Sequence, residues 1–121
     1  AETGATVLLK GARTWVATPG GWLGLVESGA PWLSTAGTGD VLAGVVGALV
    51  AARSSAAIDD PETLGPLAAS AAWLHGAAGR MAPTDEGADQ PEHRRGAEGG
   101  HPLVALEVAE AIPAVWALLS R

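Results

Sequence analysis

Short apolar runs separated by glycine- and proline-containing turns characterise the first quarter of the chain. The runs at 6–9, 14–17 and 22–26 are rich in β-forming residues and predict three short strands. The Pro-Gly-Gly sequence at 19–21 is a strong turn signal, so the second and third strands should form a hairpin. Residues 10–13 should form a polar loop that joins the first two strands.

Longer apolar stretches in the middle of the chain predict helices. The first should run from about 38 to 53, and its two glycines, three residues apart, suggest close packing against a sheet. Asp60 can cap a second helix and Pro61 suits its first position, so we expect this helix to continue to about Met81.

The last part of the chain divides into a polar loop and a further helix. Residues 83–100 hold many charges and few apolar side chains, which is typical of a long loop. A helix should span 102–111, and Pro113 should kink or restart it before 115–119.

Strands followed by packed helices indicate the α/β class. Three short strands are a thin sheet for helices so rich in Ala, Leu and Trp. The chain also starts at Ala1, almost at its first strand. We therefore expect residues 1–121 to be one part of a larger domain, with more of the sheet supplied by residues outside this chain.

Composition excludes several classes of function. The chain of 121 residues has a formal net charge of −6, whereas a nucleic-acid surface needs a basic face. It has no cysteine, which excludes disulfides and thiolate metal sites and fits a cytoplasmic location. The apolar run at 41–52 would span only ~18 Å as a helix, too short to cross a bilayer. We expect no nucleic-acid partner and no membrane partner.

Residues 35–44, Thr-Ala-Gly-Thr-Gly-Asp-Val-Leu-Ala-Gly, are the most informative for function. A flexible turn at Gly37 and Gly39 opens directly into a helix whose first turn contains Asp40. The N-terminus of a helix can bind phosphate through its N–H groups, and glycines let a ligand approach the backbone. A carboxylate there can accept the proton of a hydroxyl that attacks a phosphoryl group. The pattern therefore suggests phosphoryl transfer from a nucleotide to an alcohol.

The same residues also fit an ordinary helix start. The chain has 17 glycines, and an Asp in the first turn of a helix complements the helix dipole. The run is not a P-loop, since no Gly-Lys-Ser/Thr follows, and Leu42 occupies the third position of a dinucleotide-binding fingerprint. On physical grounds alone, an ordinary helix start is the more common origin of such a pattern.

Three segments together resemble one family. They are 8–14 (Leu-Leu-Lys-Gly-Ala-Arg-Thr), 33–44 (Leu-Ser followed by the run above) and 73–79 (Trp-Leu-His-Gly-Ala-Ala-Gly). Their order and spacing are similar to those in the C-terminal half of the bacterial ADP-dependent NAD(P)H-hydrate dehydratases, members of the ribokinase-like superfamily. The terminal helix at 106–119 fits as well, so the resemblance covers essentially the whole chain.

The resemblance implies a repair reaction on hydrated NAD(P)H. A nucleotide, usually ADP in bacteria, phosphorylates the ring hydroxyl, after which phosphate leaves and the double bond returns. AMP is the other product, and Mg²⁺ assists. The resemblance also implies a ribokinase-like, three-layer α/β/α fold of which residues 1–121 form the C-terminal part. The N-terminal half would then lie on the same or a separate chain, and the protein would form a homo-oligomer.

Roles for individual residues follow from the same resemblance. Asp40 would contact the substrate and act as base, and the main-chain amides of 37–40 would form an anion hole for the transferred phosphoryl group. Gly39 would also lie against the nucleotide. The expected catalytic residues are Gly37, Thr38, Gly39 and Asp40, and the expected AMP-binding loop is Lys10, Gly11, Ala12, Arg13 and Thr14. No residue is assigned to a metal.

Two other functions compete with this one. A ribokinase-like kinase of a sugar would usually have Asp at the place of Thr35, and a hydroxymethylpyrimidine kinase would have Cys at the place of Asp40. A catalytically silent nucleotide-binding module is the second. We expect His75 to be an ordinary helix histidine with satisfied hydrogen bonds rather than a ligand, and Trp32 to belong to the core.

Overall fold

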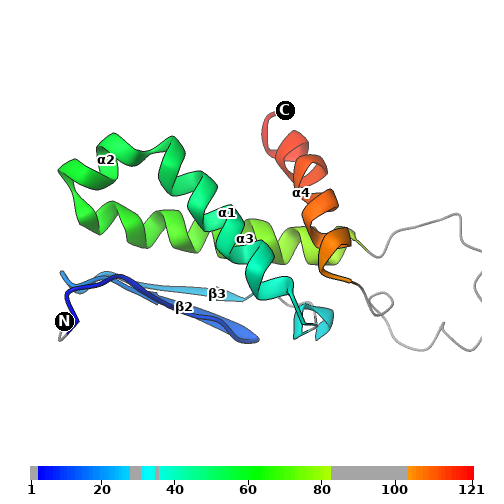
Figure 1. Cartoon of the computed structure of the whole chain (residues 1–121), viewed down its shortest axis with the longest axis horizontal. Helices are drawn as coiled ribbons and strands as arrows, with labels where there is room; N and C mark the ends of the chain where they lie inside the picture. Colours follow the sequence, from blue (N-terminus) through cyan, green and yellow to red (C-terminus); the bar gives the residue numbers. More distant parts are fainter. Residues whose placement is uncertain (1–2, 28–30, 35, 83–103) are drawn as a thin grey trace, which may run out of the picture.

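A small antiparallel sheet covered on one face by helices makes up the chain (Figure 1). The computed structural model describes residues 3–27, 31–34, 36–82 and 104–121. The strands are β1 (Val7–Leu9), β2 (Arg13–Ala17) and β3 (Leu23–Glu27), and the helices are α1 (Thr38–Ala52), α2 (Ser54–Asp59), α3 (Leu64–Met81) and α4 (Ala105–Leu119). Two short 3-10 turns, η1 (Pro31–Ser34) and η2 (Pro61–Thr63), connect them.

All three predicted strands are confirmed, each within one residue of its expected bounds. They pair in the order β1-β2-β3, and both pairs are antiparallel. The register places Trp15 of β2 between Leu9 of β1 and Leu25 of β3. The mixture of sheet and helix fits the expected α/β class.

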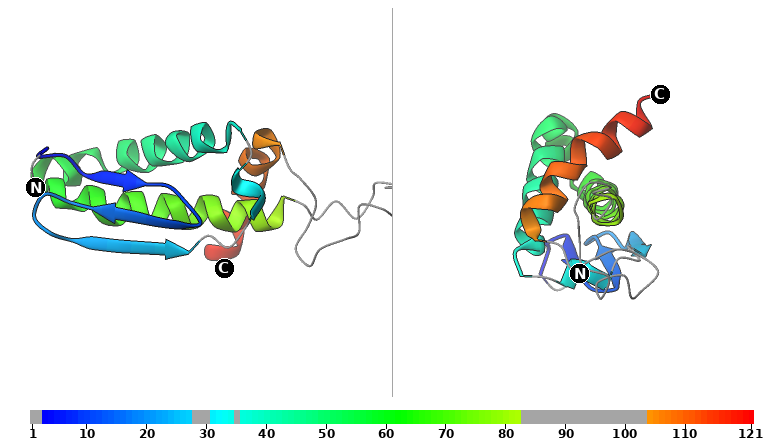
Figure 2. Two further views of the ribbon diagram at one scale, coloured as in Figure 1. Left: turned by 90° about the horizontal axis from the view of Figure 1, so that it is seen from below. Right: turned by 90° about the vertical axis from the view of Figure 1, so that its right-hand side faces the viewer.

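The two faces of the sheet differ in what covers them. Side chains alternate along β2, so that Thr14 and Val16 are buried beneath the helices. Figure 2 shows the helices on one side of the sheet only. The described residues thus form two layers of the expected three. The other face is apolar but between 40% and 66% exposed, and it comprises Val7, Leu9, Trp15, Leu23 and Leu25.

The turn between β2 and β3 is tied to the start of α3. The Glu62 carboxylate accepts hydrogen bonds from the Thr18 hydroxyl and from the Gly20 N–H, the latter at 2.8 Å. A Cβ on Gly65 would lie 2.6 Å from both Thr18 and Trp22, so this glycine is what lets helix and turn touch. These contacts fix the orientation of the hairpin on α3.

Helix prediction succeeded where the signals are local. The expected helices at 38–53 and up to Met81 are confirmed. Asp60 accepts a hydrogen bond from the Glu62 N–H at 3.1 Å, with Pro61 at the first position, although the element that follows begins as a 3-10 turn. Helix α2 was not predicted from the sequence.

The terminal helix differs from its prediction. It begins at Ala105 rather than 102, and Pro113 lies inside it without ending it. Proline removes one main-chain hydrogen bond from a helix, but the helix continues through Pro113, whose side chain is exposed. The expected loop at 83–100 lies outside the described residues, as does the side chain of Trp32.

Helix α3 is the centre of the fold, because it contacts α1, α4, β2 and β3. Small side chains such as Ala71 and Ala78 are fully buried on it and let its neighbours approach. The close packing expected of Gly44 and Gly47 in α1 was wrong for the described residues, since a Cβ on either would meet nothing within 4 Å. Among the helical glycines of the described residues, the closely packed ones are Gly65 and Gly79 of α3.

Candidate functional site

The turn that starts α1 depends on glycine at position 37. Gly37 has φ +87°, in the left-handed region, and is the N-cap of the helix. Its carbonyl accepts hydrogen bonds from the N–H groups of Asp40 (3.1 Å) and Val41 (3.2 Å). A Cβ at Gly37 would also lie 3.0 Å from the Cβ of Ala105 in α4. Backbone angle and space both favour glycine here.

On the inner side of this turn, the carbonyl oxygen of Leu33 accepts two hydrogen bonds. Thr38 is 1% exposed, and its hydroxyl donates to the carbonyl oxygen of Leu33 at 2.6 Å. Lys10 Nζ donates to the same oxygen at 2.9 Å. The Leu33 side chain packs where a Cβ on Gly79 of α3 would otherwise be, at 2.6 Å. Leu33 thus joins the end of β1, the start of α1 and the core helix.

His75 of α3 forms a hydrogen bond to the main chain of the same turn. Its Nε2 lies 2.8 Å from the carbonyl oxygen of Thr38, and its side chain is 2% exposed. Because a carbonyl oxygen only accepts, Nε2 must carry the hydrogen. Burial lowers the pKa of His75, the bond to Thr38 raises it, and the positive charge of Lys10 lowers it further. The net shift is downward, which favours the neutral imidazole and confirms the expectation of a histidine with a satisfied hydrogen bond.

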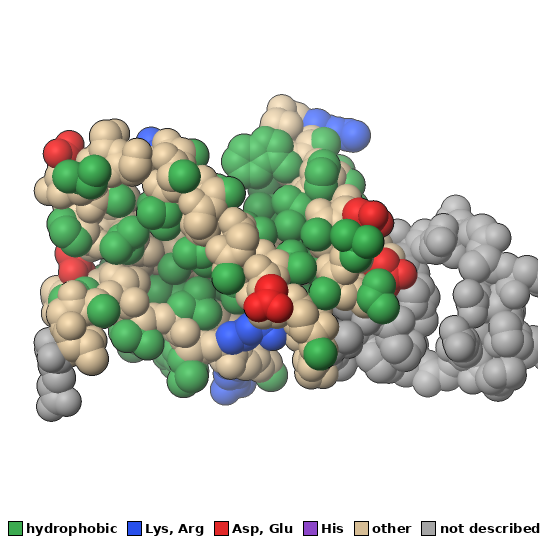
Figure 3. Space-filling view, viewed as in Figure 1, with side chains coloured by type: hydrophobic (Ala, Val, Ile, Leu, Met, Phe, Trp, Pro, Cys, Tyr) green, Lys and Arg blue, Asp and Glu red, His purple; other side chains and the backbone are tan. Residues whose placement is uncertain are grey.

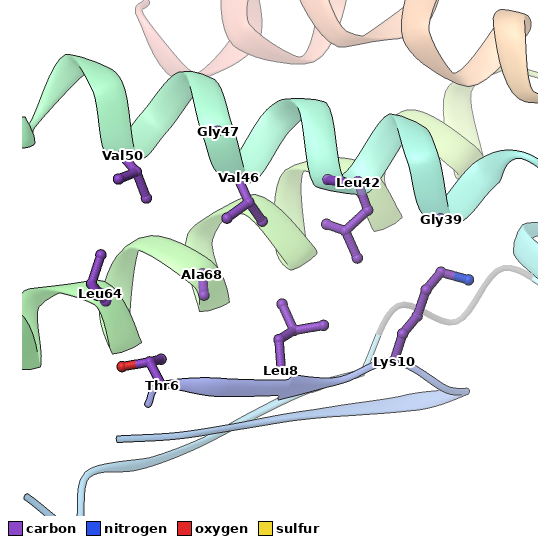
Figure 4. A pocket seen from close by; sticks show the side chains of 11 residues that line it. Thr6, Leu8, Lys10, Gly39, Leu42, Val46, Gly47, Val50, Leu64 and Ala68 are labelled. Carbon is purple, nitrogen blue, oxygen red and sulfur yellow. The ribbon is translucent and has the colours of Figure 1, made fainter. Parts of the chain in front are cut away.

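The outer side of the turn is open. Gly39 and Asp40 are exposed, and a Cβ on Gly39 would meet nothing within 4 Å. Gly39 and Lys10 line one end of a cavity of about 690 Å³ between β1, α1 and α3. Figure 4 shows Lys10 rising from the end of β1 toward Gly39. This end of the cavity brings together a cation, an open glycine backbone and a helix N-terminus, which suits an anion.

The rest of this cavity is apolar. Figure 4 shows Leu8, Leu42 and Val46 pointing into it, and Figure 3 shows hydrophobic side chains over much of the face on which it opens. The remaining lining residues are Thr6, Ala43, Gly47, Val50, Leu64 and Ala68. Thr6 adds a hydroxyl elsewhere in this lining, and the end at Lys10 and Gly39 combines a cation with open backbone, as a phosphate needs.

Of the predicted AMP-binding loop, only Lys10 lines this cavity. Gly11 and Ala12 are exposed in the turn between β1 and β2, and Thr14 is buried with its hydroxyl 3.4 Å from the Gly11 carbonyl oxygen. Arg13 forms an exposed ion pair with Glu27 of β3, with 3.0 Å between Nε and Oε1. The structure therefore brings Lys10 to the turn at residues 37–40, called the motif turn below. It leaves the Arg13 side chain on the sheet, paired with Glu27.

The residues that the structure describes form neither a metal-binding cluster nor a membrane-spanning helix. Within them, no group of three or more His, Asp or Glu side chains is placed to hold a metal ion. None of the helices in the same ranges combines the length and apolar character that a membrane span needs.

The roles of Leu33 and His75 were not predicted from the sequence. Leu33 acts through its carbonyl oxygen, which every residue has, so no residue type could mark it. His75 lies 37 positions from Thr38 in the chain, and only the packing of α3 beneath α1 brings them together.

Comparisons with known proteins agree with the resemblance seen in the sequence. The chain is 57% identical over 54 residues to the bifunctional NAD(P)H-hydrate repair enzyme Nnr of Mycobacterium leprae (strain TN), covering 45% of this chain and 11% of that protein. It is 45% identical over 75 residues to the ADP-dependent (S)-NAD(P)H-hydrate dehydratase of Neisseria meningitidis serogroup B, covering 62% and 23%. It is 41% identical over 86 residues to the Nnr enzyme of Moorella thermoacetica, covering 71% and 15%.

The chain therefore spans less than a quarter of the length of these relatives. No solved structure matches it. The model of the family described as NAD(P)H-hydrate dehydratase matches residues 1–95, which include β1, the motif turn and α3. The chain belongs to the NAD(P)H-hydrate dehydratase family.

Proposed function

We propose that this chain contributes the phosphoryl-transfer site of an ADP-dependent NAD(P)H-hydrate dehydratase. The observation that carries the proposal is the meeting of Lys10, the open backbone of Gly39 and the start of α1 at one end of the cavity. Family membership and the names of the relatives support the substrate and the donor.

The reaction proceeds in two stages. The hydroxyl on the hydrated nicotinamide ring attacks the β-phosphoryl group of ADP, Asp40 accepts the hydroxyl proton, and AMP leaves. The phosphate ester then loses phosphate with the electrons of its C–O bond, and loss of a proton from the adjacent carbon restores the double bond. Asp40 is suited to the first stage because it is exposed in the first turn of α1, beside the anion site.

The helix start and Lys10 supply the electrostatic part. The positive end of the α1 dipole and the N–H of Gly39 face a developing negative charge on the transferred group, and Lys10 adds a full positive charge. The N–H of Asp40, expected in the same anion hole, is instead bonded to the Gly37 carbonyl oxygen. Gly39 lets the nucleotide reach the backbone, because the space beside it is unfilled by the protein. Gly37 and Thr38 act through the geometry of the turn.

The nucleotide should contact the loop formed by Lys10, Gly11, Ala12, Arg13 and Thr14, with Lys10 nearest the phosphates. Mg²⁺ usually binds through substrate phosphates and one or two carboxylates. The described residues form no acidic cluster for it, so we expect it to arrive with the nucleotide, and no step above depends on it.

The completed domain should have the three-layer, ribokinase-like α/β/α architecture. The bare apolar sheet face needs a cover, and the apolar cavity lies along β1, an edge strand of the described sheet. Large exposed apolar patches mark surfaces that associate. We propose that an N-terminal half, on the same or a separate chain, supplies the third layer and further strands, and that the assembled protein is a homo-oligomer.

The test is turnover of hydrated NADH with ADP and Mg²⁺ by the intact protein, wild type against Asp40→Asn. The amide keeps the shape of the carboxylate but does not usefully accept the proton, so turnover should fall roughly 10²–10⁴-fold. AMP affinity should survive. Asp59→Asn is the matched control, since Asp59 is also exposed but ends α2, at the far end of α1 (Figure 1).

The outcomes separate the competing functions. Near-normal turnover in Asp40→Asn would remove Asp40 as the base. A wild-type protein that phosphorylates an alcohol without eliminating phosphate would be a ribokinase-like kinase. One that binds ADP without turnover of hydrated NADH would be a silent nucleotide-binding module.

A further inference from the structure

We propose that His75 is a positioning residue for the phosphoryl-transfer site, because it anchors the main chain of Thr38 between the two glycines of the motif turn. The inference rests on the proposed function for its catalytic test. It concerns a buried residue of the core helix α3 that does not itself line the cavity.

Backbone hydrogen bonds to the Gly37 carbonyl oxygen begin α1 at this turn, but its two glycines add no side-chain contacts of their own. Glycine has more backbone freedom than any other residue, and here it occupies positions 37 and 39. Gly39 has no side chain and no neighbour within 4 Å of where one would be. Thr38 lies between them and has the side chain through which this turn can be anchored, and it is almost fully buried.

Two hydrogen bonds connect Thr38 to two other elements, η1 and α3. Its hydroxyl donates to the Leu33 carbonyl oxygen of η1 at 2.6 Å, and its own carbonyl oxygen accepts from His75 Nε2 at 2.8 Å. The first bond holds the side chain of Thr38 and leaves the peptide plane between Thr38 and Gly39 to the helical geometry at the start of α1. The second bond reinforces that geometry, because it holds the oxygen of this same peptide plane, whose N–H belongs to Gly39. His75 therefore helps to fix the direction of the Gly39 N–H group at the open end of the cavity.

The chemical state of His75 suits this role. Its bond requires hydrogen on Nε2, and burial together with the Lys10 charge lowers its pKa and so favours a neutral donor. A neutral donor fixes the carbonyl without adding a second full charge beside Lys10.

A matched pair of variants tests the inference in the intact protein. In His75→Gln the side-chain amide nitrogen can reach the place of Nε2 and still donate to Thr38. In His75→Asn the amide is shorter by one methylene and stops short of that oxygen. We expect the Asn variant to lose about 10–100-fold in kcat, since small displacements of a positioned group cost that much, and the Gln variant to stay within about threefold of wild type. KM for hydrated NADH should change little in either.

Leu74→Val is the control for general packing damage, because Leu74 is the buried neighbour of His75 in α3 and makes no hydrogen bond to the motif turn. It should lower thermal stability and leave kcat unchanged. If the Asn variant does not fold, His75→Leu replaces it with the same expected loss. Equal kcat in the Gln and Asn variants, or a loss of kcat in Leu74→Val as large as in Asn, would overturn the inference.

ADP binding, measured by calorimetry, tests the role of His75 even if the proposed function is wrong. If the wild-type protein binds ADP but does not turn over hydrated NADH, the proposed function fails. The inference then still predicts weaker ADP binding in the Asn variant than in the Gln variant. Equal binding in the two would overturn it on that measurement as well.

Discussion

The two sides of the motif turn are built in opposite ways. On the inner side, Gly37 lies against α4, and Thr38 is bonded to η1 and α3. On the outer side, Gly39 and Asp40 are exposed and Gly39 borders an unfilled cavity. The two glycines of this motif thus occupy their positions for different reasons. Gly37 is required by the protein itself, whereas the protein leaves the space beside Gly39 for something else.

Gly37→Ala should break the inner side and have the largest effect on stability. An alanine at φ +87° costs about 1–2 kcal/mol in backbone energy, and its Cβ would press on Ala105 at 3.0 Å. We expect the free energy of unfolding of the intact protein to fall by roughly 1–3 kcal/mol, measured by urea denaturation.

Gly44→Ala is the matched control for that change. Gly44 lies in the same helix with open space around it, so alanine should leave stability unchanged or raise it by up to about 1 kcal/mol. Equal losses in the two variants would show that Gly37 has no special conformational role.

Gly39→Val tests the outer side. Valine fits the protein without a clash, so stability should hold, but its side chain would occupy the space that we assign to the nucleotide. We expect AMP or ADP affinity to fall roughly tenfold or more, the equivalent of an overpacked contact of 1–3 kcal/mol. Gly44→Val, away from the cavity lining, should leave affinity unchanged in the same titration. Unchanged affinity in Gly39→Val would contradict a nucleotide contact at this glycine.

Local signals in the sequence predicted the parts of the structure that local chemistry decides. Short apolar runs rich in β-forming residues predicted the strands, and Asp60-Pro61 marked the start of the element before α3. The motif turn was predicted with its helix because glycine and a first-turn carboxylate act within a few residues.

Non-local packing decides the rest. The run 41–52 is apolar nearly throughout, so the sequence could not tell which side of α1 meets α3, and the expectation for Gly44 and Gly47 was wrong for that reason. The start of α4 at Ala105 and its continuation through Pro113 were likewise not predicted from the sequence. The bond from His75 to Thr38 depends on how α3 lies under the turn.

Thr38→Val sharpens the comparison on the inner side with a smaller effect. Valine has the shape of threonine without its hydroxyl, so the bond from that hydroxyl to the Leu33 carbonyl oxygen is lost, while Lys10 still donates to that oxygen. Losing one hydrogen bond of this kind costs about 0.5–1.5 kcal/mol. Thermal unfolding of the intact protein should show this loss, and an unchanged or higher melting temperature would contradict the role of the hydroxyl.

The smallest expected effect is the pH dependence that His75 adds to stability. The pKa of His75 is lowered in the folded chain, first by burial and then by Lys10, against the opposing effect of its bond to Thr38. The unfolded chain therefore binds more protons than the folded one between the lowered pKa and the ordinary histidine value of about 6.5. Stability from this group is complete above that value and is lost as the pH falls through the window below it. The loss stays small because an imidazolium still donates from Nε2 to the Thr38 carbonyl, so only burial and repulsion from Lys10 oppose protonation.

Melting temperatures of wild type and His75→Gln between pH 7.5 and 5.5 measure this pH dependence, since all other titrating groups are common to both. The wild type should lose more stability on acidification than His75→Gln, and parallel curves would show that His75 does not titrate differently in the folded protein.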